Sequence, residues 1–469
     1  MFRRLCSILI FVAYTARPGT ADSLLSPEDT AFLRDQAAKV LRLARVAPGE
    51  KSGNAMNRTP YVMHLPDSHQ VYTAFWVRDS NMALGADFVS ADDVRDWIKL
   101  TAATISNKNW QIRPGVLVPA YSVPDHINFD GKPTFFPGNY EEGDKQGGGD
   151  LGTVPLLDDA FFFLFTVNEY ASMTKSAELF KSPVTTPTGP MILSDLCLKV
   201  FDAIPVNPAT GISMTGDVHQ PNAWGKDFGF CDTIQKSGRL LFTAVLKYDA
   251  ARRLAPLYRK IGNADAADRM TQAADQIKKN LVATFYHDSS YSGEGWLYSA
   301  TGVCNQPDVW GSAYAVAVGA VDGETAYKVA LSLLRGYRDR SLVNAGCVSE
   351  VLQHDSSNPK GWQNTVLPFG IYQNGAYWAT GNGWYIVALN TIDPKAARDM
   401  ARDYVEFMRA NRLENGTSQA WEWFNPGINR YEHPQYVASA AFAYGILNRA
   451  GLLGNAKKEP NDASGHIWK

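Results

Sequence analysis

Residues 239–257, RLLFTAVLKYDAARRLAPL, are followed at residues 264–283 by ADAADRMTQAADQIKKNLVA. The first stretch is apolar nearly all round and rich in small residues, which is typical of a helix buried in the interior of a protein. The second places Met270, Ala274 and Ile277 on one face at helical spacing, which predicts a half-buried surface helix. The two stretches together predict an inner helix covered by an outer helix.

The same alternation runs along the whole chain. Further inner helices are predicted at residues 72–88, 155–171, 308–321, 376–391 and 434–449. Further outer helices are predicted at residues 27–45, 91–106, 192–203, 324–336 and 394–411. Two of the outer helices begin with a capping residue and a proline, Ser26-Pro27 and Asp393-Pro394. Six inner and six outer helices predict an all-α fold, an (α/α)6 barrel.

The composition is that of a globular protein. Hydrophobic residues make up 45% of the 469 residues and charged residues 20%, and such values exclude a disordered chain. The formal net charge of −2 indicates neither a nucleic acid nor an anionic membrane as a partner. Because no shift in composition marks a boundary, we expect one barrel domain over residues 22–469.

The first residues are typical of a secretory signal peptide. Two arginines precede an apolar run from Leu5 to Tyr14, and small residues at positions 19–21 provide a cleavage site. A membrane anchor is the alternative, although the apolar run is short for spanning a bilayer. We therefore expect residues 1–21 to be removed and the mature protein to be secreted, or periplasmic in a bacterium.

The cysteines and glycines predict no cofactor and no metal site. The four cysteines that remain after cleavage could form two disulfides in an oxidising compartment, but their spacing does not fix the pairs: Cys197, Cys231, Cys304 and Cys347. No CxxC or HExxH pattern occurs. The run Gly147-Gly148-Gly149 lacks the Lys-Ser/Thr of a phosphate-binding loop and is expected to be flexible backbone.

An arginine–aspartate pair stands at the start of the first inner helix, in Trp76-Val77-Arg78-Asp79. Burying these charges is costly unless they are paired or contact a ligand. Asp79 would accept hydrogen bonds from ligand hydroxyls and Arg78 would donate to the ligand. A structural buried ion pair is the alternative.

Two further segments carry acidic side chains among aromatic residues. Asp227 and Asp232 lie in a loop with Trp224, Phe228 and Phe230 before the third inner helix. Apolar neighbours raise the pKa of a carboxyl and suit a proton donor, whereas a capping role for Asp232 is the alternative.

The second of these segments is Trp421-Glu422-Trp423, ahead of the last inner helix. An aromatic cluster whose glutamate points to solvent is the alternative here. A carboxylic acid and a carboxylate are the two groups that cleavage of a glycosidic bond requires.

These motifs resemble those of the six-hairpin glycosidases, and most of all glycoside hydrolase family 15, the glucoamylase and glucodextranase group. The chain is also similar to the glycogen-debranching glucosidases. Trp76-Val77-Arg78-Asp79 resembles a Trp-Pro-Arg-Asp motif, and Gly229-Phe230-Cys231-Asp232 resembles the Gly-Ile-Trp-Glu motif of the general acid. Glu422, with Asn425-Pro426 and Pro434-Gln435 behind it, resembles the general base segment. The resemblance covers residues 60–450 as separate motifs.

The resemblance implies an inverting hydrolase of α-glucosidic bonds with Asp232 as the acid and Glu422 as the base. Asp232 is one methylene shorter than the glutamate of the family, so Asp227 stays open as the acid. The side chains expected to bind a carbohydrate substrate are Trp76, Arg78, Asp79, Asp159, Trp310, Trp378 and Trp423. Asp159 and Trp378 belong to segments that resemble subsites, 157–159 and 373–378. Core packing is the alternative for Trp310 and Trp378.

Other functions remain open on the same barrel. They are a rhamnosidase, a uronyl hydrolase, an epimerase, a lyase and a non-catalytic glycan-binding protein. Epimerases and lyases transfer protons through His or Tyr, and the eight histidines form no cluster along the sequence, although His433 lies close to Glu422. A binding protein would need Arg78 and the tryptophans but no pair of acids.

Overall fold

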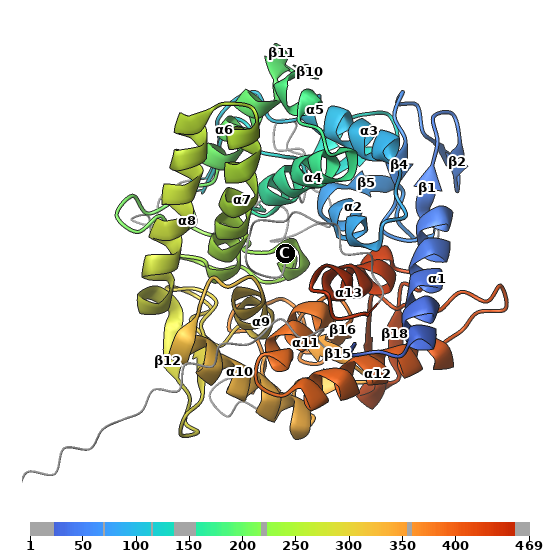
Figure 1. Cartoon of the computed structure of the whole chain (residues 1–469), viewed down its shortest axis with the longest axis vertical. Coiled ribbons are helices and arrows are strands. Elements are labelled where there is room, and N and C mark those ends of the chain that lie inside the picture. The colour runs from blue at the N-terminus through green and yellow to red at the C-terminus, as the bar shows by residue number, and fades with distance from the viewer. Residues whose placement is uncertain are drawn as a thin grey trace, which may run out of the picture.

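Six helices form a closed inner ring in the computed structural model, which describes residues 23–68, 71–113, 116–135, 156–216, 223–353 and 359–454. Each of the six packs against the next, and the last packs against the first (Figure 1). In order they are α2 (Val77–Met82), α4 (Asp159–Thr174), α7 (Leu241–Lys260), α9 (Val309–Ala317), α11 (Asn382–Asn390) and α13 (Val437–Arg449). The short 3-10 helix η1 (Leu84–Ala86) extends the first of them.

Six outer helices cover this ring, and each packs against at least one inner helix. They are α1 (Pro27–Ala44), α3 (Ala91–Ala102), α6 (Leu193–Ala203), α8 (Ala264–Phe285), α10 (Gly323–Arg338) and α12 (Pro394–Ala410). All twelve helices that the sequence predicts are therefore present, with ends that differ by several residues. The thirteenth helix of the described residues is a single turn that the sequence analysis missed, α5 (Glu178–Lys181).

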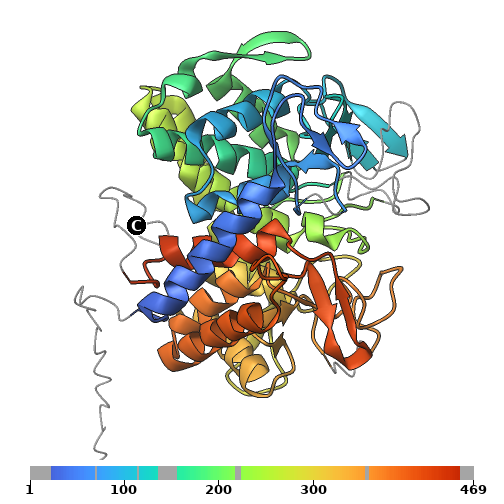
Figure 2. The same ribbon diagram turned by 90° about the vertical axis from the view of Figure 1, so that its right-hand side faces the viewer.

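The fold is not purely α-helical, which corrects the all-α prediction. An antiparallel five-stranded sheet consists of β14 (Val343–Asn344), β15 (Cys347–Ser349), β16 (Tyr377–Trp378), β17 (Trp423–Asn425) and β18 (Arg430–Glu432). A three-stranded sheet consists of β5 (Ala74–Trp76), β8 (His126–Asn128) and β9 (Pro133–Thr134). In Figure 2 the blue and cyan strands and the orange strands lie on the same side of the helices.

Five two-stranded ribbons complete the strands of the described residues. They are β1 (Arg45–Val46) with β4 (Met63–His64), β2 (Lys51–Ser52) with β3 (Ala55–Met56), β6 (Trp110–Arg113) with β7 (Val116–Val118), β10 (Pro183–Thr186) with β11 (Gly189–Ile192), and β12 (Tyr286–Asp288) with β13 (Gly295–Leu297). Strands of two to four residues are too short to show an alternating pattern in the sequence. They form because the backbone groups of long connections need hydrogen-bond partners.

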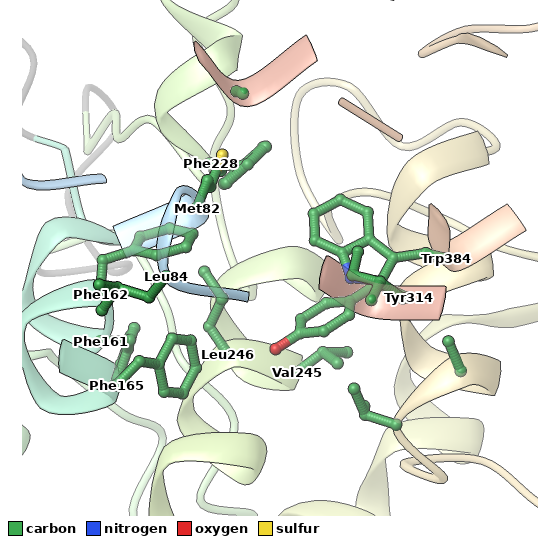
Figure 3. Close-up of a cluster of buried hydrophobic side chains, with 14 of the residues drawn as sticks. Met82, Leu84, Phe161, Phe162, Phe165, Phe228, Val245, Leu246, Tyr314 and Trp384 are labelled. Atoms are coloured by element: carbon green, nitrogen blue, oxygen red, sulfur yellow. The ribbon is translucent and has the colours of Figure 1, made fainter. Parts of the chain in front are cut away.

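Aromatic side chains fill the interior of the inner ring (Figure 3). Phe228 stacks on Phe242 with 4.3 Å between ring centroids, and Phe242 stacks on Tyr314 at 5.2 Å. Trp384 contacts Phe242 at 5.5 Å, so that α7, α9 and α11 share one aromatic cluster. These side chains leave the interior of the ring filled at this level, so a ligand is not expected to bind there.

A largely buried ion cluster, with Asp249 at its buried end, ties four inner helices together. Arg253 of α7 donates to Asp249 of the same helix at 2.8 and 3.0 Å and to Glu169 of α4 at 3.4 Å. Arg449 of α13 lies 2.9 Å from Glu169, and the Tyr314 hydroxyl of α9 donates to Asp249 at 2.8 Å. Removing one member of such a cluster leaves the others buried without compensation.

The structure tests the disulfides that the cysteines could form, but not the signal peptide. Cys197, Cys304 and Cys347 are buried free thiols, so the arrangement with two disulfides, which needs all four cysteines, is absent. The proposed signal peptide, residues 1–21, and the run at 147–149 lie outside the described residues. Within the described ranges, the helices are too short or too polar to cross a bilayer.

We predict that Asp249→Ala lowers the free energy of unfolding by about 3–5 kcal/mol, because it leaves the Arg253 guanidinium buried with an incomplete set of partners. Urea denaturation followed by circular dichroism measures the change. Asp399→Ala is the control, since it removes an exposed i,i+4 partner of Lys395 and should cost less than about 1 kcal/mol. Equal losses in the two variants would contradict a stabilising role for the buried cluster.

Candidate active site

The acidic segments singled out in the sequence meet at the amino-terminal ends of the inner helices. Asp79 and Asp159 lie in the first turns of α2 and α4. Asp232 follows the 3-10 helix η3 (Gly229–Cys231) ahead of α7, and Glu422 precedes β17 ahead of α13. The amino-terminal end of a helix favours negative charge nearby, so this end of the ring suits a group of carboxylates.

Asp232 and Glu422 are brought together by a tyrosine. The Tyr372 hydroxyl lies 3.1 Å from Oδ2 of Asp232 and 3.5 Å from Oε1 of Glu422. The two carboxyl oxygens can therefore be no farther apart than the sum of these distances. That limit falls at the lower edge of the range of about 6.5–9.5 Å that leaves room for a water molecule between two carboxyl groups.

Glu422 is buried, with 1% of its surface exposed. The Tyr72 hydroxyl donates to its Oε2 at 3.0 Å, and Nε2 of His433 lies 3.7 Å from the same oxygen. Burial raises the pKa of Glu422 well above its usual value, and the charges of Asp79 and Asp232 raise it further. Hydrogen bonds from Tyr72 and Tyr372 act in the opposite direction, because they stabilise the ionised form.

Asp232 is only partly buried, and its carboxyl also titrates at an unusual pH. Desolvation raises the pKa of Asp232 to about 6, against the charges of Lys226 and Arg78 and the hydrogen bond from Tyr372, which lower it. Since both carboxyl groups of the pair have raised pKa values, the pair retains a proton at a pH where ordinary carboxyl groups are ionised.

Asp227, the alternative acid, occupies a different position. Its carboxylate accepts from the backbone N–H groups of Phe242 at 2.9 Å and Thr243 at 2.6 Å, which are the first turn of α7. The Thr243 hydroxyl donates to it at 2.6 Å, and Nζ of Lys236 lies 3.4 Å away. Asp227 therefore caps α7, which is the role that the sequence analysis weighed for Asp232.

Arg78 lies at the centre of four aspartates. Its guanidinium is 3.5 Å from Asp125, 3.6 Å from Asp158, 3.7 Å from Asp79 and 3.8 Å from Asp159. Burial raises the pKa of Asp158 to about 7 and that of Asp159 well above the usual value. The guanidinium therefore holds the carboxyl groups of three chain segments in one place. Arg78 therefore matches the structural ion pair, which was the alternative expected from the sequence, more closely than a residue that binds a ligand.

A loop covers this cluster. The backbone N–H of Gly229 donates to Oδ2 of Asp158 at 2.7 Å, and Arg78 lies 5.0 Å from the centroid of the Phe230 ring. A Cβ atom at Gly229 would overlap the Arg78 guanidinium, so a glycine is required here. Because Asp232 follows three residues later, the Arg78 cluster fixes the position of the candidate acid.

Most of the tryptophans predicted to bind sugar are buried instead. Trp310, Trp378 and Trp423 have 1%, 0% and 3% of their surface exposed. Trp310 and Trp378 pack edge-on at 6.1 Å, which places them in the core behind the site. Trp76 keeps some exposed surface and stacks on His126 with 4.4 Å between ring centroids.

Several residues of the site were not identified as site residues from the sequence. They are Tyr72, Asp125, His126, Tyr372 and Tyr436. Tyr436 directly follows the Pro434-Gln435 pair, and its hydroxyl donates to Oδ1 of Asp79. Asp125 lies 2.7 Å from Nδ1 of His126 and faces Arg78. Tyr72 and Tyr372 are single tyrosines in loops, 350 and 50 positions from Glu422, and no sequence pattern marks them.

The segment at 373–378 contacts the loop that carries Asp232. Oε1 of Gln373 accepts from the backbone N–H of Thr233 at 2.9 Å and from its hydroxyl at 2.8 Å. Gln373 therefore holds the residue next to Asp232. Over the ranges that the structure describes, no group of three His, Cys, Asp or Glu side chains is arranged to hold a metal ion.

No protein-family model and no curated protein sequence matches the chain. Among solved structures the chain is similar to a glucoamylase from Saccharomycopsis fibuligera, at 12% identity over 93% of this chain and 97% of that chain, with a TM-score of 0.52. It is also similar to a rhamnosidase from Klebsiella oxytoca with rhamnose bound, at 14% identity over 93% of this chain and 66% of that chain, with a TM-score of 0.51.

A third similar structure is that of a metal-independent α-mannosidase from Streptococcus pneumoniae in a non-productive complex with α-1,6-mannobiose. The identity is 10%, over 90% of this chain and 94% of that chain, with a TM-score of 0.52. At such low identity these similarities establish the fold alone. The fold is that of the (α/α)6 domains of six-hairpin glycosidases, and structural neighbours of this chain are glycosidases that act on different sugars.

We predict that Asp227→Ala lowers the free energy of unfolding by about 3–5 kcal/mol, because it leaves the buried Lys236 without this partner and removes the cap of α7.

Asp232→Asn should be at least as stable as the parent protein at pH 8. Its raised pKa means that ionised Asp232 opposes folding once the pH exceeds about 6. Urea denaturation of both variants at pH 5 and pH 8 checks this, and a strong loss in Asp232→Asn would refute the assignment.

Proposed function

We propose that the protein is a glycoside hydrolase whose acid–base pair is Asp232 and Glu422. The observation that carries the proposal is the pair of carboxyl groups with raised pKa values, bridged by Tyr372 at one end of the inner ring. Glycosidic cleavage requires one protonated and one ionised carboxyl group at the same time, and two nearby carboxyl groups tend to share a proton in this way.

In this proposal Asp232 is the general acid and Glu422 is the general base, which are the roles that the resemblance to family 15 implies; burial raises the pKa of both carboxyl groups and does not by itself assign the roles. Glu422 accepts a hydrogen bond from the Tyr72 hydroxyl and, when Asp232 is protonated, a second one from Tyr372. These hydrogen bonds offset part of the cost of ionising a buried carboxyl group. Asp232 is less buried and has a pKa of about 6, so a substantial fraction of it is protonated in mildly acidic solution. It would give this proton to the glycosidic oxygen while Glu422 removes a proton from water.

The substrate in this proposal is an α-linked glucoside, and the reaction inverts the anomeric centre. The motifs that resemble family 15 support both points. A neutral sugar also fits the charges of the site, because Asp79, Asp232 and Glu422 lie close together. The carboxylate of a uronic acid would be repelled there, which disfavours a uronyl hydrolase. A pair of carboxyl groups with raised pKa values has no use in a protein that only binds glycans.

We also propose that the enzyme acts outside the cytoplasm. The basic start, the apolar run and the small residues within positions 1–21 support this proposal. A glycan outside the cell would then be its substrate, and the mature N-terminus of the exported protein would begin at residue 22.

The two carboxyl variants test the catalytic roles against a panel of disaccharides and aryl glycosides. Glu422→Gln keeps the shape of the side chain but removes the base, so turnover should fall by about 10²–10⁴-fold on all substrates. Asp232→Asn should lose cleavage of disaccharides yet retain part of its activity on aryl glycosides whose leaving groups need little protonation. If instead Glu422→Gln spares the activated substrates, the roles of the two residues are exchanged. If the enzyme cleaves only rhamnosides or only mannosides, that sugar takes the place of glucose in the proposed substrate.

We predict inversion of the anomeric centre, because the motifs resemble family 15 and the two carboxyl groups come from opposite parts of the barrel. The contacts of Tyr372 restrict the facing carboxyl oxygens to the lower edge of the inverting range or below it, so the stereochemistry of the product is decisive. Proton NMR of the first product formed from an α-glucoside, recorded before mutarotation, should show the β-anomer. Early accumulation of the α-anomer would indicate a covalent intermediate and a separation of about 5–5.5 Å.

A further inference from the structure

We propose that Tyr372 relays a proton from Glu422 to Asp232 between turnovers. The inference rests on the acid–base function proposed above. An inverting reaction leaves its base protonated and its acid ionised. Before the next substrate can be cleaved, one proton must leave Glu422 and one must reach Asp232.

The geometry provides a direct route for this proton. The Tyr372 hydroxyl lies within hydrogen-bond distance of Oδ2 of Asp232, at 3.1 Å, and at the outer limit of that distance, 3.5 Å, from Oε1 of Glu422. A hydroxyl can donate one hydrogen bond and accept another. In the state that follows cleavage, the Glu422 carboxylic acid donates to Oη of Tyr372, and the Tyr372 hydroxyl donates to ionised Asp232.

The transfer moves one proton and leaves the tyrosine neutral. The O–H bond of Glu422 breaks as its proton joins Oη of Tyr372, and the original hydroxyl bond of Tyr372 breaks as that proton joins Oδ2 of Asp232. No oxidant, reductant or further reactant takes part. The products are ionised Glu422, protonated Asp232 and an unchanged Tyr372, which is the arrangement that the next turnover needs.

Burial explains why such a route is needed on the side of Glu422. With 1% of its surface exposed, Glu422 has little contact with bulk solvent, and the water molecule that it activates is consumed in the reaction. His433 is partly exposed, but its Nε2 lies 3.7 Å from Oε2 of Glu422, which is beyond hydrogen-bond distance. Tyr72 donates to Oε2 of Glu422 at 3.0 Å, so its hydroxyl contacts Glu422 on the oxygen that does not face Tyr372.

Tyr372 is held firmly enough to act as a fixed bridge. The centroid of its ring lies 4.9 Å from that of Trp378 and 6.0 Å from that of Trp423, and both tryptophans are buried. Its carbonyl accepts from Nε1 of Trp378 at 3.2 Å and from the backbone N–H of Ala376 at 3.1 Å. Its φ angle of 51° is rare for a residue other than glycine, and such strain is typical of functional sites. The two tryptophans thus act through Tyr372 and not as sugar platforms.

Rapid-mixing kinetics of Tyr372→Phe separates the relay from a contribution to cleavage. The variant keeps the ring and loses the hydroxyl. We expect a first turnover close to that of the parent protein, followed by steady-state turnover that is slower by about 10-fold or more. This appears as a burst of up to one product per active site. Added imidazole buffer should restore the slow phase, because it can carry the proton instead.

Two comparison variants complete the experiment. Tyr72→Phe removes a donor to Glu422 alone and should slow the first and later turnovers alike, without a burst. Tyr431→Phe, at an exposed ring that stacks on Phe424, should behave as the parent protein. Equal slowing of all turnovers in Tyr372→Phe, or no change in either, would overturn the relay.

A titration without substrate distinguishes failure of the relay from failure of the proposed function. The hydrogen bond from Tyr372 lowers the pKa of Asp232, so carbon-13 NMR of labelled aspartate should show that pKa rising in Tyr372→Phe and unchanged in Tyr431→Phe. Lys226, Arg78 and Asp125 also act on this pKa and are the same in both variants. An unchanged pKa refutes the bridge even in an active enzyme, whereas a parent protein that cleaves no glycoside refutes the function and the relay with it.

Discussion

The position of the site depends on the burial of a single guanidinium group. Arg78 has 4% of its surface exposed, and a charge at such depth is tolerated only when opposite charges surround it. The sequence meets this requirement with Asp79 beside it, Asp125 from a loop, and Asp158 and Asp159 at the start of α4. One cation therefore determines how two inner helices and a loop meet.

The consequences of this burial reach both candidate catalytic residues. Asp158 also accepts from the backbone of Gly229, which places the loop that ends in Asp232 directly over Arg78. On the other side, Asp79 accepts from the Tyr436 hydroxyl at the start of α13, close to Glu422. The two carboxyl groups of the pair are thus positioned by contacts that begin at the same buried cluster. A change at Arg78 would disturb the site even though Arg78 is shielded from a substrate.

The helices were predictable because each one repeats a local pattern over ten or more residues. Closure of the ring follows from such patterns, since six helices that are apolar on all sides can be buried only against one another. The small sheets were not predictable in this way. The pairing of β16 with β17 joins Tyr377 to Phe424, and this contact depends on how two loops fold over the ring. No local periodicity encodes it.

The residues of the candidate site also differ in how far the sequence reveals them. Arg78, Asp232 and Glu422 stand in dense groups of charged and aromatic residues, which made them visible in the sequence. The tyrosines of the site were not visible, because a single tyrosine in a loop has the same appearance whether it packs in a core or bridges two carboxyl groups. For a related reason the sequence could not separate two roles of the tryptophans, because a large ring serves core packing and sugar binding equally well. Only the folded structure shows that Trp378 and Trp423 both contact the ring of Tyr372.

The carboxyl groups of the site are held at a cost to stability, and this cost bears on the function that we propose for them. A carboxyl group whose pKa is raised by folding binds its proton more tightly in the folded state than in the unfolded state. Its favourable contribution is complete below the unfolded pKa and is lost as the pH rises through the folded value. For Asp232 that window ends at about 6, and for Asp158 at about 7. The same burial that weakens the fold above this window keeps a proton available within it, and an acid–base pair of carboxyl groups needs that proton.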